Sequence, residues 1–252
     1  MAGVLLSIGV CLSATAALAY VLPGGAILRR LVNMRNDLRL TSLKVDGTLS
    51  FYGDAVRDAS QALSLPGDRP ETQADAAIFL RLPGRCRLEV TTAEGNRISV
   101  VEAGGRHGNE GASVESLNAA LHTVCVLLAV RGSSEQDTRA ELDRTLRGIG
   151  IEPKVTGLGR MGDGIAYVLG RAGEGQPQFW VFKDSFQPAR LRYSDAQKAA
   201  WDIRFLDYSS PFAGDLFPRV IEVSRNGDRL LRFTVLRADT KTPLQDRLFS
   251  AQ

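Results

Sequence analysis

The sequence contains little of the chemistry that enzymes and metal proteins use. Its 252 residues include only two histidines and three cysteines. His107 lies in the glycine-rich stretch GGRHGNE, where we expect a solvent-exposed turn, and His122 has no second ligand four residues further on. No zinc-ligand spacing, G-x-S-x-G motif, phosphate-binding loop or dinucleotide fingerprint occurs. We therefore expect no catalytic residue, no metal and no cofactor, and predict that the protein is not an enzyme.

Dense blocks of like charge are also missing. The formal net charge is +3, and the basic residues, mostly arginines, are scattered among acids. Proteins that follow nucleic-acid phosphates usually carry a basic run or patch, so we expect no nucleic-acid partner. The chain also lacks internal repeats and a linker that would divide it. These absences predict one domain over residues 20–252, and we expect a monomer.

The first 19 residues carry no charge and end in Ala17-Leu18-Ala19, a small-residue pattern that precedes signal cleavage. The stretch is short for a membrane span, although its start lacks the lysine or arginine of most signal peptides. We predict that residues 1–19 are a cleaved signal peptide and that the product is exported in soluble form. The alternatives are an uncleaved anchor or a buried first element.

Three stretches have apolar residues at helical spacing. They are residues 24–38, residues 113–130, and a stretch that runs from a Ser133-x-x-Gln136 capping box to Gly148. A polar connection, residues 52–76, is expected to contain one further short helix near residues 54–63. The apolar stripe of each helix must cover another surface of the protein.

Most of the remaining chain alternates between apolar and polar residues, as strands with one solvent-exposed face do. Asn226-Gly227 is the strongest hairpin turn. About eleven strands, mostly in antiparallel hairpins, predict a mainly β fold with α-helices. We expect a single curved antiparallel sheet that forms an incomplete, unclosed β-barrel, with helices on its concave side. The predicted strands are residues 43–51, 78–82, 86–90, 96–104, 153–159, 164–170, 178–183, 188–194, 201–208, 217–225 and 229–237.

Removal of the signal peptide would take Cys11 with it and leave Cys86 and Cys125. An even pair of cysteines in an exported chain indicates a disulfide. Cys86 falls in a predicted strand and Cys125 in a predicted helix, so their bond would pin that helix against the sheet. The alternative is two unrelated buried thiols.

The stretch FWVFKDSFQPARLRY, residues 179–193, combines unusual aromatic bulk with a hairpin pattern. Trp180 and Phe182 share one face of its first arm, while Leu191 and Tyr193 share one face of the second. Aromatic residues at alternate strand positions usually fill an ordinary core. The functional alternative is that they line an apolar cavity.

The last hundred residues resemble the LolA/LolB-type outer-membrane lipoprotein carriers. FWVFKDSFQPARLRY resembles two paired strands of that family, with an aromatic strand, an acidic turn and a return strand that begins with proline. WDIRFLDYS is similar to the strand that follows, and FTVLRADTKTPLQDRLF resembles the closing pattern, with Asp246, Leu248 and Phe249 at its end. The order of signal, amphipathic helix and alternating strand at the front agrees. The long connection at residues 52–76 and the cysteine pair depart from the family pattern.

This resemblance implies an incomplete barrel, lidded by helices, that carries acyl chains of lipoproteins or lipids through the periplasm toward the outer membrane. The implied partners are those acyl chains, an inner-membrane donor protein and an outer-membrane acceptor protein. The alternative is a sensor or regulatory module, as in the RseB-like relatives of the fold, which binds a lipid-like signal or a protein. The helical lid is expected to use Leu117, Leu121, Val124 and Leu128. The acyl cavity is expected to be lined by Leu43, Val45, Leu49, Phe51, Leu80, Leu88, Trp180, Phe182, Leu191, Trp201, Ile203, Phe205 and Phe233.

Overall fold

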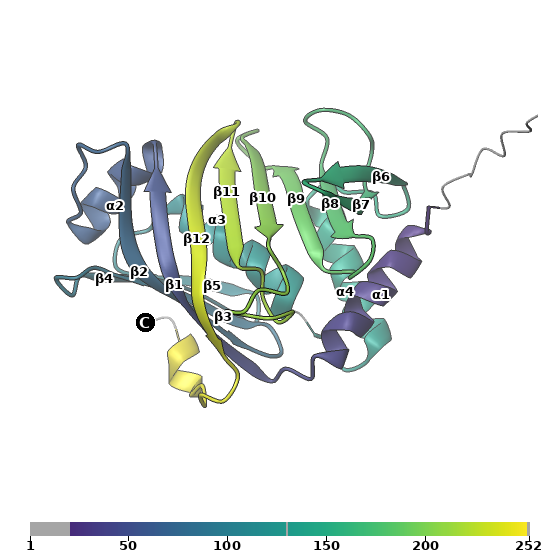
Figure 1. Cartoon of the computed structure of the whole chain (residues 1–252), viewed down its shortest axis with the longest axis horizontal. Coiled ribbons are helices and arrows are strands. Elements are labelled where there is room, and N and C mark those ends of the chain that lie inside the picture. The colour runs from purple at the N-terminus through teal and green to yellow at the C-terminus, as the bar shows by residue number, and fades with distance from the viewer. Residues whose placement is uncertain (1–20, 130, 251–252) are drawn as a thin grey trace, which may run out of the picture.

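The computed structural model in Figure 1 describes residues 21–129 and 131–250. The predicted signal peptide, residues 1–19, lies outside the described residues, and so does Cys11. Among the helices of the described ranges, none combines the length and the apolar character that crossing a membrane requires.

One antiparallel sheet contains all twelve strands assigned in the described residues, and it does not close into a barrel. This confirms the expected mainly β fold with an open, curved sheet. The strand order is β5-β4-β3-β2-β1-β12-β11-β10-β9-β8-β7-β6. The strands are β1 (Ser42–Tyr52), β2 (Glu71–Arg81), β3 (Arg85–Thr91), β4 (Arg97–Ala103), β5 (Arg106–Glu110), β6 (Thr156–Met161), β7 (Gly164–Leu169), β8 (Gln178–Phe182), β9 (Pro188–Ser194), β10 (Ala200–Leu206), β11 (Val220–Arg225) and β12 (Asp228–Asp239).

Four α-helices accompany the sheet in the described part of the chain, including the short helix expected near residues 54–63. Ser134, not Ser133, is the N-cap of the last of them, and its hydroxyl accepts a hydrogen bond from the amide of Asp137 (3.1 Å). The helices are α1 (Gly24–Asp37), α2 (Asp54–Leu63), α3 (Glu115–Val124) and α4 (Glu135–Gly148), with a π-helical turn η1 (Cys125–Ala129) after α3 and a 3-10 helix η2 (Asp246–Phe249) near the end.

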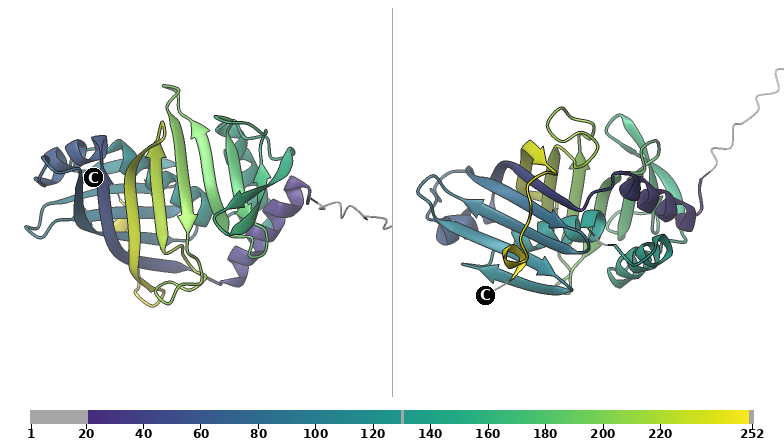
Figure 2. Two further views of the ribbon diagram at one scale, coloured as in Figure 1. Left: turned by 45° about the horizontal axis from the view of Figure 1, so that its top comes forward. Right: turned by 90° about the horizontal axis from the view of Figure 1, so that it is seen from below.

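The sheet consists of two meanders that meet where β1 pairs with β12. Within each meander every strand pairs with its neighbours in sequence, so β5 and β6 become the two free edges. Most connections are short, but the β1–β2 connection contains α2 and the β10–β11 connection spans residues 207–219. Figure 2 shows the curvature that brings the β2–β5 side around toward the helices. Helix α3 lies behind β10 and β11 in Figure 1 and contacts β3 and β4, while α1 packs against α4 beyond the β9 side. Helix α3 therefore occupies the concave side of the sheet, which we call the inner face.

Two strands differ most from the predictions, and β6 and β11 each begin three residues later than predicted. Strand β2 begins at Glu71, inside the connection expected for residues 52–76, because Thr72, Ala74 and Ala76 face inward there. Their small side chains give a weak period-2 signal. Strand β5, expected as a solvent-exposed turn around His107, has no fully buried residue and forms an edge of the sheet. Edge strands of polar residues carry no alternating apolar pattern that a sequence could reveal.

Candidate functional site

The inner face is lined by apolar side chains in rows that run across the strands. In one row the register places Phe179 opposite Leu191, and Leu191 opposite Ile203. Farther along the sheet, Phe205 lies opposite Ile221, which lies opposite Phe233. All are buried and belong to one hydrophobic cluster. Because directly opposed residues share a face, these rows make a continuous apolar floor beneath α3.

Residues 115–129, formed by α3 and η1, cover this floor and are called the lid. Leu117, Leu121 and Val124 are at most 1 % exposed, and Leu128 is partly buried against the same cluster. Leu121 and Val124 border a crevice of about 20 Å³ between the lid and the sheet. A space of this size holds about one water molecule. The lid is therefore closed on the sheet in this conformation.

A second crevice of about 20 Å³ lies between α1 and the same face of the sheet, lined by residues that include Leu43, Leu80, Leu128 and Tyr208. The Tyr208 hydroxyl is buried and has no hydrogen-bond partner among the described residues. Burial raises the pKa of Tyr208 above its usual value. The hydroxyl is thus a neutral donor at a mostly apolar crevice, whose wall also includes Arg35, Gln187 and Asp215.

The two ends of the lid are held in different ways. Toward its carboxyl end, where α3 passes into η1, Cys125 forms a disulfide with Cys86 of β3, which confirms the predicted pairing. At its amino end, Glu115 accepts a hydrogen bond from Arg225, whose side chain also approaches Asp54 (3.8 Å). Glu115 and Asp54 are 57 % and 62 % exposed, so these ion pairs contribute at most about 1 kcal/mol. The amino end of the lid is the weaker attachment.

The Glu115–Arg225 contact lies at an aromatic rim of the inner face. The Arg225 guanidinium lies over the ring of Trp201 (5.7 Å), and that ring stacks on Tyr193. Burial, above all, raises the pKa of Tyr193 to about 12. Trp201 is 3 % exposed, and its indole nitrogen donates to Asp195 (2.8 Å). This rim closes the inner face at the end where the lid begins.

Most residues expected to line the cavity are brought together, and two are not. Trp180 and Phe182 are half buried. Phe179 and Val181, which alternate with them along β8, are fully buried on the inner face. The residues that the structure does gather in the inner cluster, with Leu128 at its margin, are Leu43, Val45, Leu49, Phe51, Leu80, Leu88, Leu191, Trp201, Ile203, Phe205, Phe233, Leu117, Leu121 and Val124.

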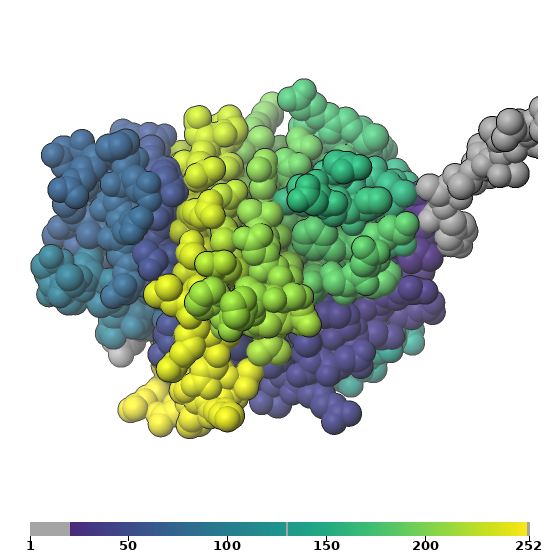
Figure 3. Space-filling model, viewed as in Figure 1, coloured from purple at the N-terminus to yellow at the C-terminus, as the bar shows by residue number. Residues whose placement is uncertain are grey.

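Trp180 faces away from the lid. Its ring lies against the guanidinium of Arg190 (5.4 Å), which forms two hydrogen bonds with Asp202 (2.7 and 2.6 Å). Figure 3 shows the outer face of the sheet. The strand QFWVF is apolar at both sets of alternate positions, so its sequence does not say which set points inward. The prediction that Trp180 and Phe182 line the inner face is therefore wrong, because the inner face of β8 carries Phe179 and Val181 instead.

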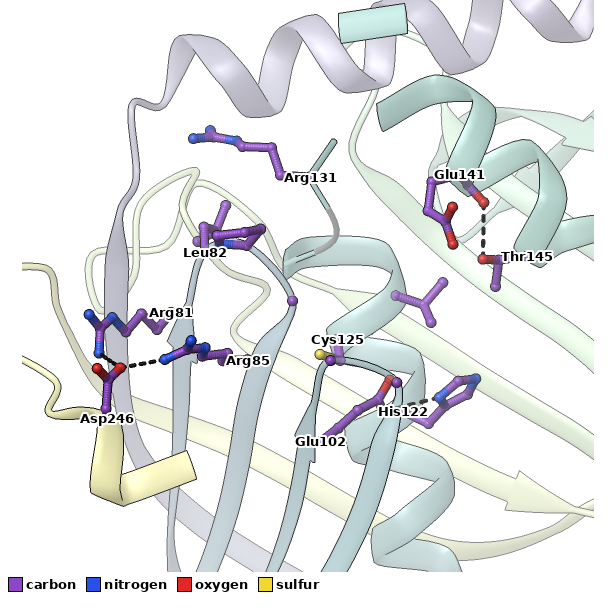
Figure 4. Close-up of a pocket in the computed structure, with 15 residues that line it drawn as sticks. Arg81, Leu82, Arg85, Glu102, His122, Cys125, Arg131, Glu141, Thr145 and Asp246 are labelled. Atoms are coloured by element: carbon purple, nitrogen blue, oxygen red, sulfur yellow. Dashed lines mark hydrogen bonds and ion pairs between the residues drawn. The ribbon is translucent and has the colours of Figure 1, made fainter. Parts of the chain in front are cut away.

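A larger, open hollow of about 700 Å³ lies outside the lid, between the turns that follow β2 and β4 and the side of α4 that carries Glu141 and Thr145 (Figure 4). Its wall includes Glu102, His122 and Cys125 of the disulfide. In the sequence the two histidines are isolated, because residues 107 and 122 show no metal-ligand spacing. The fold brings both next to Glu102, which no local pattern signals.

This chain is similar in fold to known proteins, but its sequence matches none of the families or curated proteins compared. No protein-family model matches the sequence, and the search of curated proteins found no match. Among solved structures, the chain is similar to a LolA superfamily protein from Nitrosomonas europaea, with a TM-score of 0.55 and 12 % identity over 91 % of this chain and 98 % of that one. A DUF1329 family protein from Desulfovibrio piger gives a TM-score of 0.45 and 13 % identity over 90 % and 97 %. The chain therefore has a LolA-like fold, as its sequence resemblance implied.

Proposed function

We propose that this protein is a carrier that binds an extended acyl chain between the inner face of its sheet and the lid. The observation that supports the proposal is a continuous apolar floor covered by one helical segment with unequal attachments. The disulfide at Cys125 keeps the lid in place, while the exposed Glu115–Arg225 pair can open at low cost. The π-helical turn at Cys125–Ala129, a type of irregularity frequent at functional sites, lies where such a movement would bend the chain.

The magnitudes of the competing terms are compatible with reversible binding. Exposing Leu117, Leu121 and Val124 would cost roughly 1.5–3 kcal/mol each, or about 5–9 kcal/mol in total. An acyl chain recovers about 0.8 kcal/mol per buried methylene, so about twelve methylenes recover about 10 kcal/mol. The two terms nearly cancel. A carrier requires this balance, because it must both bind its cargo and release it.

The two crevices mark a path for the acyl chain. Leu43 lines the crevice under α1 and Leu49 lines the crevice under α3, and both lie on the inner face of β1 with Val45 between them. Six strand residues span roughly 20 Å. A chain lying along β1 would join the crevices and displace the lid side chains. The buried Tyr208 hydroxyl would then offer a hydrogen bond to an ester or amide carbonyl at one end of the path.

The proposed cargo is the acyl part of a lipoprotein or lipid, taken up in the periplasm after export and passed toward the outer membrane. A donor protein at the inner membrane and an acceptor at the outer membrane complete the proposal. A sensor or regulatory module that binds a lipid-like signal or a protein remains the competing function, and the experiment below separates the two.

The test uses mature protein, freed of bound lipid, and a fluorescent fatty acid. We expect Phe233→Gln, which places an amide in the crevice under the lid, to weaken probe binding at least about fivefold, because a buried polar group without partners costs about 1–3 kcal/mol. Trp180→Gln is the matched control on the outer face and should leave the affinity within about twofold. Circular dichroism verifies that both variants are folded.

Arg225→Gln provides a kinetic arm of the same experiment. Loss of the Glu115 contact should speed probe uptake and release while changing equilibrium affinity little, because the bound chain does not touch the rim ion pair. Mass spectrometry of lipids that copurify with the protein identifies the natural cargo. Absence of acyl species together with absence of probe binding would refute the carrier function, and capture of a non-lipidated protein partner would favour the sensor.

A further inference from the structure

Two imidazoles and one carboxylate, those of His107, His122 and Glu102, converge at the edge of the hollow. Glu102 and His122 are labelled in Figure 4. The Nδ1 atom of His122 lies 3.1 Å from Oε2 of Glu102, and the Nδ1 atom of His107 lies 3.6 Å from the same oxygen. One ligand atom from each residue lies within 4.8 Å of the others. The first distance fits a hydrogen bond, but the second is too long for one. A hydrogen bond therefore does not account for the position of His107.

We propose that Glu102, His107 and His122 form a binding site for a divalent transition-metal ion such as Zn²⁺. Zinc binds imidazole nitrogen and carboxylate oxygen at about 2.0–2.2 Å, so two ligands of a tetrahedral ion lie about 3.4 Å apart. The separations of 3.1 and 3.6 Å lie on either side of this value. Small side-chain rotations would suffice to bind the ion, and the backbone would not need to move.

The backbone holds two of the ligands in place before metal binds. Glu102 and His107 are directly opposed in the β4–β5 hairpin, whose two-residue turn, Gly104-Gly105, has both φ angles positive (58° and 76°). Such turns match the twist of the paired strands and fix the register, which places opposed side chains on one face. Glu102 is 11 % exposed, so it is a partly desolvated carboxylate beside two accessible imidazoles.

The disulfide holds the third ligand in place. Cys86 is the residue opposite Glu102 on the other side of β4, and it is bonded to Cys125 of the lid. His122 lies one helical turn before Cys125, on the side of α3 that faces the hollow. The covalent bond therefore fixes the distance between His122 and Glu102, which come from different elements.

The surroundings leave room for a cation and for a fourth ligand. Arg81, Arg85 and Arg131 line the hollow, and Asp246, which binds both Arg81 and Arg85, offsets one of these three positive charges. Glu141 adds a carboxylate to the opposite wall. Glu102 and His122 face the open hollow of about 700 Å³, so water can complete the coordination. Because His122 belongs to the lid and the other two ligands to the sheet, the ion would tie the lid to β4 and β5.

The experiment measures zinc binding by isothermal titration on mature, chelator-treated protein. The natural chain has only two histidines, so any affinity tag that contains histidine must first be removed. We expect one equivalent of Zn²⁺ to bind, and His107→Ala and His122→Ala each to weaken binding at least about tenfold. Glu141→Gln, a carboxylate of the same hollow that is not a ligand, should bind zinc as the unchanged protein does. Equal melting temperatures without metal verify that the variants are folded.

Two further measurements test the tie between lid and sheet. Zinc at one hundred times its Kd should raise the melting temperature by about 5 °C or more, and it should slow amide hydrogen exchange in residues 115–124. Neither change should occur in His122→Ala.

Copper(II) and nickel(II) are titrated in parallel, and tighter binding of either would change the identity of the ion but not the location of the site. Binding that survives both histidine substitutions, or no binding of any of the three ions below about 100 µM, would overturn the proposal. None of these measurements depends on acyl binding. They therefore test the metal site independently of the proposed carrier function.

Discussion

Gly47 shows at the scale of one residue how the inner face is built. It lies on the inner side of β1, where a Cβ atom would be 2.4 Å from the carbonyl oxygen of Thr234 and 2.7 Å from the ring of Phe233. A bulge between Asp46 and Gly47 accompanies this contact with β12. The absence of a side chain at Gly47 therefore leaves room for the Phe233 ring beneath the lid.

We predict that Gly47→Ala lowers the free energy of unfolding by about 1–3 kcal/mol, because the added methyl group overpacks the contact with Phe233. Gly25→Ala is the matched control. Gly25 lies in α1 with no atom within 4 Å of its added Cβ, so alanine should raise stability there by about 0.5 kcal/mol or more. Urea unfolding of the two variants measures both values. Equal stability of Gly47→Ala and the unchanged protein would contradict the packing described.

At the scale of elements, the lid is joined to the sheet by one covalent bond and by side-chain packing. The bond joins Cys86 in β3 to Cys125 at the start of η1, at a sequence separation of 39 residues. The loop that it closes contains β4, β5 and α3, so the bond restrains the region that holds the hollow and the lid.

We predict that the double variant Cys86→Ser, Cys125→Ser unfolds at a lower temperature. The chain-entropy model assigns about 4 kcal/mol to a loop of this length, which corresponds to a fall in melting temperature of about 8–16 °C. Calorimetry in the absence of reductant makes the measurement. A reducing agent should lower the melting temperature of the unchanged protein toward the same value and leave the double variant unaffected. An unchanged melting temperature in both cases would show that the thiols do not stabilise the fold.

At the scale of the whole molecule, strands from both meanders and residues from all four described α-helices join one hydrophobic cluster. Trp180 reports on the outer face and Trp201 on the inner face, and the chain has no other tryptophan. Because one core serves both meanders, neither is expected to be stable without the other.

We predict a single cooperative unfolding transition for the mature protein. Urea curves followed by tryptophan fluorescence and by far-ultraviolet circular dichroism should superimpose, as they do for two-state domains. Two separated transitions would indicate that the β2–β5 side and the β6–β11 side unfold as independent units, and would contradict a single domain over residues 20–252.

The sequence by itself determined most elements and the general class of the fold. Alternating residues in β1, the Asn226-Gly227 turn and the apolar spacing of α3 are local patterns with a period of 2 or 3.6 residues, which sequence reveals directly. The cysteine pair could be predicted because only two cysteines remain outside the first 19 residues.

Only the tertiary structure decided the features that depend on contacts between distant segments. Both alternate sets of side chains in β8 are apolar. Packing against the rest of the chain therefore decides that Phe179 and Val181, and not Trp180, point to the inner face. The meeting of His107 and His122 at Glu102 depends on a hairpin register and on a disulfide that joins α3 to the sheet. Local periodicity records which face of an element is apolar, but which faces meet is settled by the free energy of packing the whole chain.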